Sequence, residues 1–526
     1  MIADVIGNYL DNIEEREFDA PFIALLRASG FRDIHFLHGA FEFGKDFVAK
    51  REEDGVLYQY AFQTKAGNLG LGEWNKDRGQ IDLLRTNSLA HPDFDRTLPR
   101  RAVFVTTGRL TGAAPLAAQE YSEHLKQLGE LEFILWDRET LIGMMSENPE
   151  IGLAGTVQGP LLAVLGKIDA GDLSEKELEQ FSRRWIAETG TLENLWNSAV
   201  EATVVASRLR RQERLDFACY AALCLVRAAW PATHAAEPPN RISVTIAELG
   251  RSLFRYYAST LFERCGEEDL DPLAFIHAHE IPTAFVTYPV RCLRLVELLG
   301  LFGLLEHKTG EPVVGQVVGY LARFFEKHPG AVHPISDRWA VSIIPPILLL
   351  AKNGERERIT SILKGVARWI GDRYEKDSLG LAGPHATAGE EVDYLLGTPF
   401  EHIDLRRRSE SYVSTVVLDM AALLEMGDVY KVARNEFLAV DAMSCVVETQ
   451  DTPGQYVMGS PDTRYEPNMQ YKEDWSPEDG WKVAPHHYRS QPSYYLARIS
   501  RHWDHLAVSS VLRDRHFLPT CRAMIA

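Results

Sequence analysis

The stretch that decides the fold is residues 42–65, which read EFGKDFVAKREEDGVLYQYAFQTK. Two runs rich in β-branched and aromatic residues flank the charged turn at 52–55, and this pattern predicts a β-hairpin. Asp46 stands at the start of the first strand, and Gln63 and Lys65 end the second, on one face because side chains alternate along a strand. An acid and a lysine that converge in this way can hold a divalent metal and activate water for phosphodiester hydrolysis.

The elements around this hairpin predict a small α/β domain, a mixed sheet flanked by helices, over residues 1–155. Apolar residues recur at helical spacing before a stop at Ser29-Gly30. The glycine-rich connection at 66–72 lacks the Gly-Lys-Ser/Thr ending of a nucleotide-binding P-loop. The predicted elements are helical residues 1–30, a strand at 31–37, the hairpin, a helix from about Glu73, a strand at 101–107, a helix at 113–128, a strand at 131–136 and a helix at 137–145.

The rest of the chain has a different composition. Residues 170–445 are predicted to form an α-helical sensing or scaffold domain of stacked helix pairs, although no repeat of fixed period is visible. Residues 446–526 are predicted to be an irregular, aromatic-rich segment and terminal helices that pack on the helical domain. The predicted helices lie at 174–190, 193–230, 245–264, 284–305, 313–328, 336–352 and 355–375.

Charge and composition limit the classes of function. The 526 residues carry a net charge of −18, so the chain has no overall basic signature of a nucleic-acid binder. The first 150 residues contain 25 acidic and 16 basic residues, a net −9, so any nucleic-acid affinity has to come from a local patch, an oligomer or a partner. Six cysteines without a C-x-x-C pair, and no secretory signal or bilayer-length apolar run, predict a cytoplasmic protein without a membrane segment.

The pattern Asp46 … Gln63-x-Lys65 resembles the PD-(D/E)XK nuclease superfamily, and most closely its Mrr-like restriction endonuclease branch, in which Gln often replaces the second acid. The resemblance covers about residues 15–150. The flanking segments that share it are Phe18-Asp19 in the first helix, Gln80 in the helix after the lysine, the strand FVTTG at 104–108 and the segment LWDRETL at 135–141.

This resemblance implies a restriction-endonuclease-like domain with Asp46, Gln63 and Lys65 as catalytic residues. Asp46 and Gln63 would bind Mg²⁺, for which Mn²⁺ is expected to substitute, and Lys65 would orient the attacking water and stabilise charge on phosphorus. Because Gln63 is neutral, a further acid is needed, and either Glu42 or Asp19 is expected to supply it, with Glu42 as the predicted third metal ligand.

Each supporting residue has a simpler reading. Glu42 can be a solvated acid at the strand edge, and Asp19 a helix-capping or surface acid. We expect Gln80 to face the phosphate or to contact the residues that bind the metal. The alternative is that Gln80 only occupies an exposed position on its helix.

The predicted function is a metal-dependent endonuclease acting on DNA, in a bacterial anti-phage defence or restriction system. The helical region would control this activity or recruit a partner of the same system, and a homo-oligomer is expected. Two alternatives stay open at this point. The nuclease fold can be catalytically inactive and serve as a nucleic-acid-binding or protein-interaction scaffold, or the same fold can be an RNase, since nothing in the sequence reads a 2′-hydroxyl.

Overall fold

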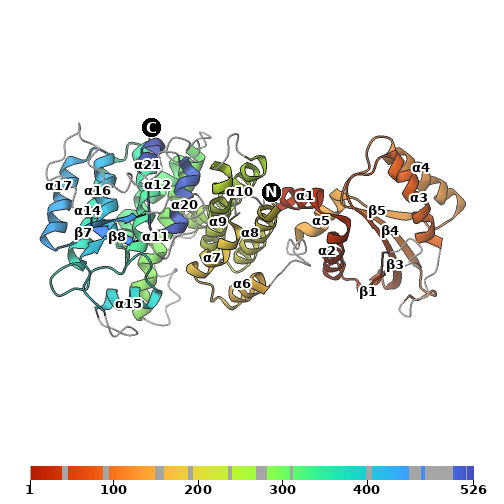
Figure 1. The fold of residues 1–526 in the computed structure, drawn as a ribbon, viewed down its shortest axis with the longest axis horizontal. Coiled ribbons are helices and arrows are strands. Elements are labelled where there is room, and N and C mark those ends of the chain that lie inside the picture. The colour runs from red at the N-terminus through yellow and green to blue at the C-terminus, as the bar shows by residue number, and fades with distance from the viewer. Residues whose placement is uncertain are drawn as a thin grey trace. The chain divides into compact units, whose positions relative to one another are not determined.

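The computed structural model describes residues 2–37, 46–86, 94–147, 159–186, 193–234, 240–267, 281–307, 312–397, 405–448, 464–467, 502–516 and 518–525 (Figure 1). Its contacts divide the chain into two compact units, Met1–Gly166 with Trp196–Val204, and Lys167–Leu195 with Val205–Ala526. The predicted end of the first domain at residue 155 falls outside the described residues, so the domain bounds stay a prediction.

The first unit is built on a five-stranded mixed sheet, as the sequence predicts. The strands follow the order β1-β2-β3-β4-β5, in which the first three are antiparallel neighbours and β3, β4 and β5 run parallel. The parallel pairs need crossover connections, and a helix supplies each one. The strands are β1 (Arg32–Phe36), β2 (Phe47–Glu53), β3 (Val56–Lys65), β4 (Arg100–Thr106) and β5 (Phe133–Trp136).

The β2–β3 hairpin turns at Asp54 and Gly55, which both have positive φ, 49° and 78°. Two positive φ values at the centre of a two-residue loop are typical of a type I′ turn, which matches the twist of the flanking strands. The turn fixes the register, so that Phe47 lies opposite Phe62. Asp46, the residue before β2, donates its backbone N–H to the carbonyl of Phe62 at 2.8 Å and therefore lies beside the end of β3.

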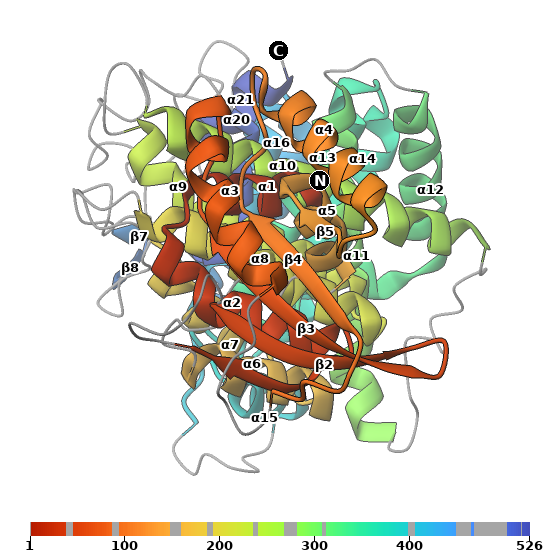
Figure 2. The same ribbon diagram turned by 90° about the vertical axis from the view of Figure 1, so that its right-hand side faces the viewer.

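Helices cover both faces of this sheet (Figure 2). A buried cluster joins α1, α2 and α5 to one face, and another joins α3 and α4 to the opposite face. Asp137 accepts a hydrogen bond from the N–H of Thr140 at 3.1 Å and so caps the N-terminus of α5. The helices are α1 (Ile2–Asn12), α2 (Glu15–Ala28), α3 (Leu71–Thr86), α4 (Ala114–Leu128) and α5 (Arg138–Glu147).

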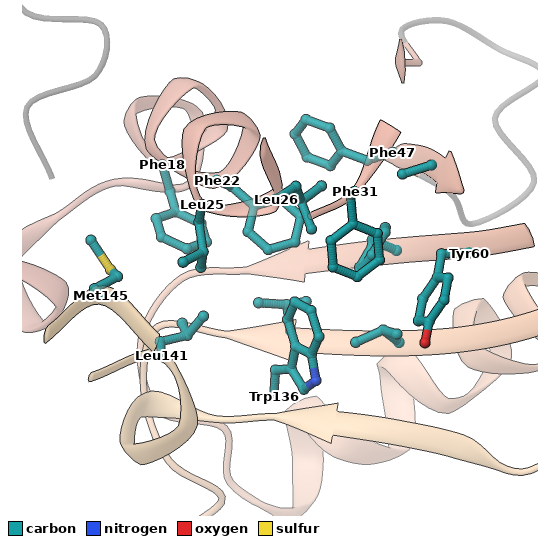
Figure 3. Close-up of a cluster of buried hydrophobic side chains, with 14 of the residues drawn as sticks. Phe18, Phe22, Leu25, Leu26, Phe31, Phe47, Tyr60, Trp136, Leu141 and Met145 are labelled. Carbon is teal, nitrogen blue, oxygen red and sulfur yellow. The ribbon is translucent and has the colours of Figure 1, made fainter. Parts of the chain in front are cut away.

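An aromatic cluster holds α2 against the sheet (Figure 3). The ring of Phe22, which is fully buried, lies 5.2 Å from Phe47, 5.4 Å from Phe62 and 6.3 Å from Trp136, each in an edge-on arrangement. Burying one such side chain contributes roughly 1.5–3 kcal/mol. The docked helix brings its first turn, which begins at Glu15, to the end of β3.

The second unit is mostly helical, which confirms the predicted fold class. The expected single helix at 193–230 is wrong, because the chain turns at 212–214 and α9 begins anew at Leu215. Its helical elements are α6 (Gly159–Ala170, shared with the first unit), α7 (Glu175–Ser182), η2 (Arg183–Trp185), α8 (Glu193–Arg211, likewise shared), α9 (Leu215–His234), α10 (Arg241–Glu267), α11 (Ile281–Glu306), α12 (Val313–Lys327), η5 (Pro329–Val332), η6 (Asp337–Ile343), α13 (Ile344–Lys352), α14 (Arg356–Arg373), α15 (Ala388–Leu396), α16 (Tyr412–Leu423), α17 (Gly427–Ala439), α20 (His502–Leu512) and α21 (Leu518–Ile525).

A small sheet in the second unit was not expected from the sequence. Its strands are β6 (Glu410–Ser411), β7 (Met443–Glu448) and β8 (Arg464–Pro467), with β6 and β7 parallel and β7 and β8 antiparallel. Strands of two to six residues are too short for an alternating pattern to stand out. Most of the aromatic-rich segment at 450–485 lies outside the described residues.

One described helix passes a length-and-composition test for a membrane span, the window Leu215–Thr233 of α9. Within the structure 89% of this window is buried, as in the core helix of a soluble protein. The test therefore gives only weak evidence for a membrane segment, and the cytoplasmic location stays a prediction.

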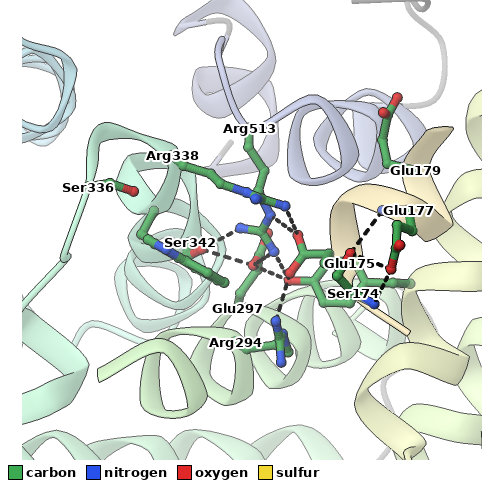
Figure 4. Close-up of polar contacts among 12 residues, drawn as sticks. Ser174, Glu175, Glu177, Glu179, Arg294, Glu297, Ser336, Arg338, Ser342 and Arg513 are labelled. Atoms are coloured by element: carbon green, nitrogen blue, oxygen red, sulfur yellow. Dashed lines mark hydrogen bonds and ion pairs between the residues drawn. The ribbon is translucent and has the colours of Figure 1, made fainter. Parts of the chain in front are cut away.

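A buried network of charges ties the helical unit together (Figure 4). Glu175 on α7 pairs with Arg294 on α11 at 2.8 Å, with Arg338 at 3.4 Å and with Arg513, which follows α20. Arg513 also pairs with Glu297 at 3.0 Å. Although burial alone would raise the pKa of Glu175, the three guanidiniums around it hold that pKa well below its usual range.

Replacing the buried Arg513 is expected to destabilise the helical unit strongly. Arg513→Met removes the guanidinium that pairs with Glu297 and one of the three that surround Glu175, and breaking a buried pair costs about 3–5 kcal/mol. Urea unfolding of the full chain measures the loss. Arg264→Met is the matched control, because Arg264 pairs with Glu213 at an exposed site where an ion pair contributes about 0–1 kcal/mol. Equal stability of the two variants would contradict a stabilising role for the network.

Candidate active site

The carboxylate of Asp46 is held in place from β3. Its Oδ2 atom accepts hydrogen bonds from the backbone N–H of Thr64 at 2.7 Å, from the Thr64 hydroxyl at 2.9 Å and from Nε2 of Gln63 at 2.8 Å. Within the described part of the chain, every hydrogen bond to this carboxylate goes to Oδ2. The carboxylate is therefore oriented through Oδ2, and Oδ1 is left without a hydrogen bond to any described residue.

Gln63 lies on the same strand and is 4% exposed. Its amide nitrogen faces Asp46, so its carbonyl oxygen Oε1 is the amide atom left for another contact. Asp46 Oδ1 and Gln63 Oε1 are both hard oxygen donors, the kind that Mg²⁺ prefers. The structure thus brings together two of the residues that the sequence predicts as metal ligands.

Burial raises the pKa of Asp46, while the hydrogen bonds from Thr64 and the positive charge of Lys65 act in the opposite direction. A carboxylate that is buried in this way favours a bound cation, because a cation offsets the cost of desolvating the negative charge. A proton competes for the same oxygen as the pH falls.

Lys65 ends β3 two residues after Gln63, and 20% of its side chain is exposed. Its Nζ atom lies 3.4 Å from Oε1 of Glu15, in the first turn of α2, and its charge also acts on Asp46. Sequence reasoning missed Glu15 and named Asp19, one turn later on the same helix. The sequence does contain an indication of Glu15, because it precedes Asp19 by four residues and residues four apart on a helix share a face.

The three predicted supporting residues, Glu42, Asp19 and Gln80, differ in what the structure shows of them. Glu42 lies outside the described residues, and Asp19 is half-buried on α2. Gln80 is half-buried on α3, and its Oε1 atom is buried without a hydrogen-bond partner among the described residues. Asp77, one turn before Gln80, is 6% exposed and feels the charge of Lys65. No sequence motif marks Asp77, although its three-residue spacing from Gln80 places both residues on one face of α3.

The donor set can be tested against the metal that the resemblance implies. Among the residues that the structure describes, no three His, Cys, Asp or Glu side chains are grouped to hold a metal. Mg²⁺ does not require such a cage, since it keeps several waters and binds one or two carboxylates together with substrate phosphates. Asp46 and Gln63 fit this mode of binding. The full predicted set of Asp46, Gln63 and Glu42 stays a prediction.

Removing the Thr64 hydroxyl is expected to loosen Asp46. Thr64→Val keeps the shape of the side chain but deletes one hydrogen bond to a carboxylate, a bond worth about 1.5–3 kcal/mol. Urea unfolding at neutral pH should show this loss. The loss should shrink as acid protonates Asp46, whose raised folded pKa places that change above the ordinary range for aspartate. Thr64→Ser is the control that keeps the hydroxyl, and a pH-independent loss in Thr64→Val would contradict the assignment.

Comparison with known proteins agrees with the fold of the first unit. A family model described as a restriction endonuclease, the Mrr catalytic domain, matches residues 10–145, a range that includes β1 to β5 and Asp46, Gln63 and Lys65. No curated protein and no solved structure matches the chain.

Proposed function

We propose, on the premise that residues 10–145 form an Mrr-like PD-(D/E)XK nuclease domain, that the protein is a Mg²⁺-dependent endonuclease hydrolysing phosphodiester bonds in DNA. The observation that carries the proposal is the contact between Asp46 and Gln63, 2.8 Å long, with Lys65 two residues further along the same strand. A half-buried carboxylate, an amide oxygen and an ammonium group at one strand end supply ligands for a metal and a cation for a phosphate.

Each residue has a defined task in this mechanism. Asp46 and Gln63 would hold the Mg²⁺, which polarises a phosphate oxygen and lowers the pKa of bound water when it is present. Thr64 keeps the Asp46 carboxylate in one orientation. Lys65 leaves Glu15, contacts the scissile phosphate and stabilises the charge that grows on it as a water oxygen bonds to phosphorus and the P–O bond to the leaving sugar breaks.

The role of the second unit is proposed to be control. The chain is acidic overall, with a net charge of −18, and a duplex phosphate backbone is repelled by such a surface unless a local patch or partner offsets it. We therefore infer that the helical unit holds the nuclease in check until a trigger or a partner binds, as in an effector of bacterial anti-phage defence or restriction.

Replacing Lys65 tests the catalytic assignment. Lys65→Ala is expected to lower plasmid DNA cleavage in Mg²⁺ by at least 10²–10³-fold, roughly the effect of removing one group that stabilises a transition-state charge. Lys126→Ala is the matched control, because Lys126 is exposed on α4. Agarose-gel assays with plasmid, single-stranded DNA and RNA compare the variants.

The same assay separates the alternatives. Cleavage of RNA alone, lost in Lys65→Ala, would replace the DNA substrate by RNA. Equal cleavage by wild type and Lys65→Ala would contradict the site, and the absence of cleavage with every substrate, at every Mg²⁺ or Mn²⁺ concentration and with the partner present, would favour the inactive scaffold.

A further inference from the structure

The helical unit contains a half-buried arginine that has no acid of its own. Arg291 lies on α11, and no hydrogen bond or ion pair joins its guanidinium to another described residue. Burial lowers the pKa of Arg291, because removing a guanidinium from water disfavours its charge. Charged groups that leave water usually meet an opposite charge or a ligand, so the surroundings of Arg291 were searched for one.

Two further arginines lie close by, gathered around one carboxylate. Arg294 follows Arg291 by three residues and so shares its face of α11. Asp216, in the first turn of α9, lies 3.0 Å from Nη1 of Arg294 and 3.5 Å from Nε of Arg214. The same two guanidiniums also contact the ring of Phe217, with their Cζ atoms 4.9 and 3.9 Å from its centroid. Elements from two helices therefore bring these side chains to the start of α9.

The charge of this cluster is unbalanced. The charged groups that act on Arg291 are Asp216, Arg294 and Arg214. Three guanidiniums and one carboxylate leave two positive charges in excess. Glu175 also pairs with Arg294, but it divides its charge between this guanidinium and the two others of the buried network. A local positive excess in a chain with a net charge of −18 favours the binding of an anion.

Donors in the cluster are left without acceptors. The Nε atom of Arg294 is buried, and no acceptor among the described residues reaches it. The side chains of Arg214 and Asp216 are 35% and 28% exposed, so a solute can reach the cluster from water. The N-terminus of α9, a helix that begins at Leu215, adds backbone N–H groups and the positive end of its dipole.

Phosphate fits this arrangement better than other anions. A guanidinium donates two parallel hydrogen bonds to phosphate oxygens, and a phosphate group carries roughly the two negative charges that the cluster lacks. A long nucleic acid would also meet the acidic surface of the whole chain, whereas a small molecule responds mainly to the local charge. The ligand class that follows is a small molecule with a phosphate group.

We propose that Arg214, Arg291 and Arg294 form a binding site in the helical unit for the phosphate group of a small molecule. The phosphate competes with Asp216 for two of the guanidiniums and gives Arg291 the partner that it lacks. Because Arg294 also pairs with Glu175, the ligand acts directly on the buried network of the helical unit. Its role as the trigger that releases the nuclease rests on the proposed function, whereas its binding does not.

Calorimetric titration of the full chain tests binding without DNA or metal. In phosphate-free buffer at low salt, pyrophosphate and ATP should each bind one per chain, and more tightly than inorganic phosphate. Arg291→Gln should weaken pyrophosphate binding about 10–100-fold, the effect of losing one hydrogen bond between charged groups. Arg368→Gln, which removes an exposed arginine on α14, is the matched control and should bind like wild type. Equal weakening in both variants would overturn the site.

A variant of the acid gives a result of the opposite sign. Asp216→Asn removes the carboxylate that occupies two of the guanidiniums, so a chain that stays folded by circular dichroism should bind pyrophosphate more tightly than wild type. A merely structural role of the cluster predicts the reverse. Unchanged or weaker binding by the folded variant would contradict the proposal.

Thermal unfolding gives a second readout for Arg291. Without phosphate, Arg291→Gln should raise the melting temperature, because it removes an unpaired charge beside two like charges. With pyrophosphate, wild type should gain more stability than Arg291→Gln, since a ligand that binds only the folded state stabilises it. A lower melting temperature in phosphate-free Arg291→Gln would show that the guanidinium has a partner in the protein and would overturn the proposal.

The outcomes separate this inference from the proposed function. Absence of binding by all three probes would overturn the site and leave the nuclease assignment to the Lys65→Ala assay. Binding of a DNA duplex in their place, lost in Arg291→Gln, would overturn the small-molecule class. If pyrophosphate is the trigger, it should raise plasmid cleavage by wild type and not by Arg291→Gln, which controls for Mg²⁺ that pyrophosphate removes. Binding that leaves both rates equal would overturn the trigger role.

Discussion

The site depends on the hydrogen bonds that residues of β3 donate to the Asp46 carboxylate. Three hydrogen bonds from Gln63 and Thr64 converge on one oxygen, and all three require the strand register that the Asp54-Gly55 turn imposes. A slip of one residue would turn Gln63 and Lys65 to the opposite face of the sheet. The hairpin therefore determines both the fold of the first unit and the geometry of its chemistry.

Packing on both faces of the sheet then completes the site. The aromatic cluster around Phe22 docks α2, and this places Glu15 beside Lys65. On the other face, α3 brings Asp77 within the field of the same lysine. The result is a lysine between acids from two helices, in a setting with excess negative charge. Because excess negative charge repels a phosphate, we expect that a divalent cation has to bind before the site can bind a phosphate.

Much of the first unit could be predicted from the sequence, because its strands and helices have strong periodicity and its hairpin has a distinctive turn. Glu15 and Asp77 were missed because their roles arise only when helices dock on a sheet. The break between α8 and α9 at 212–214 was missed because its residues, Gln, Glu and Arg, are good helix formers. In the structure Glu213 leaves the helical conformation, with a positive φ of 59°. The buried network was also invisible, since 338 positions separate Glu175 from Arg513.

The most direct test of the central claim, that Asp46 and Gln63 form a metal site, is anomalous diffraction from crystals of the protein soaked in Mn²⁺. We predict an anomalous peak about 2.0–2.2 Å from Asp46 Oδ1, at a distance typical of a first-row metal–oxygen bond, with Gln63 Oε1 as a further ligand. Metal peaks elsewhere in the domain, with none at Asp46 in crystals of a form that cleaves DNA, would contradict the account.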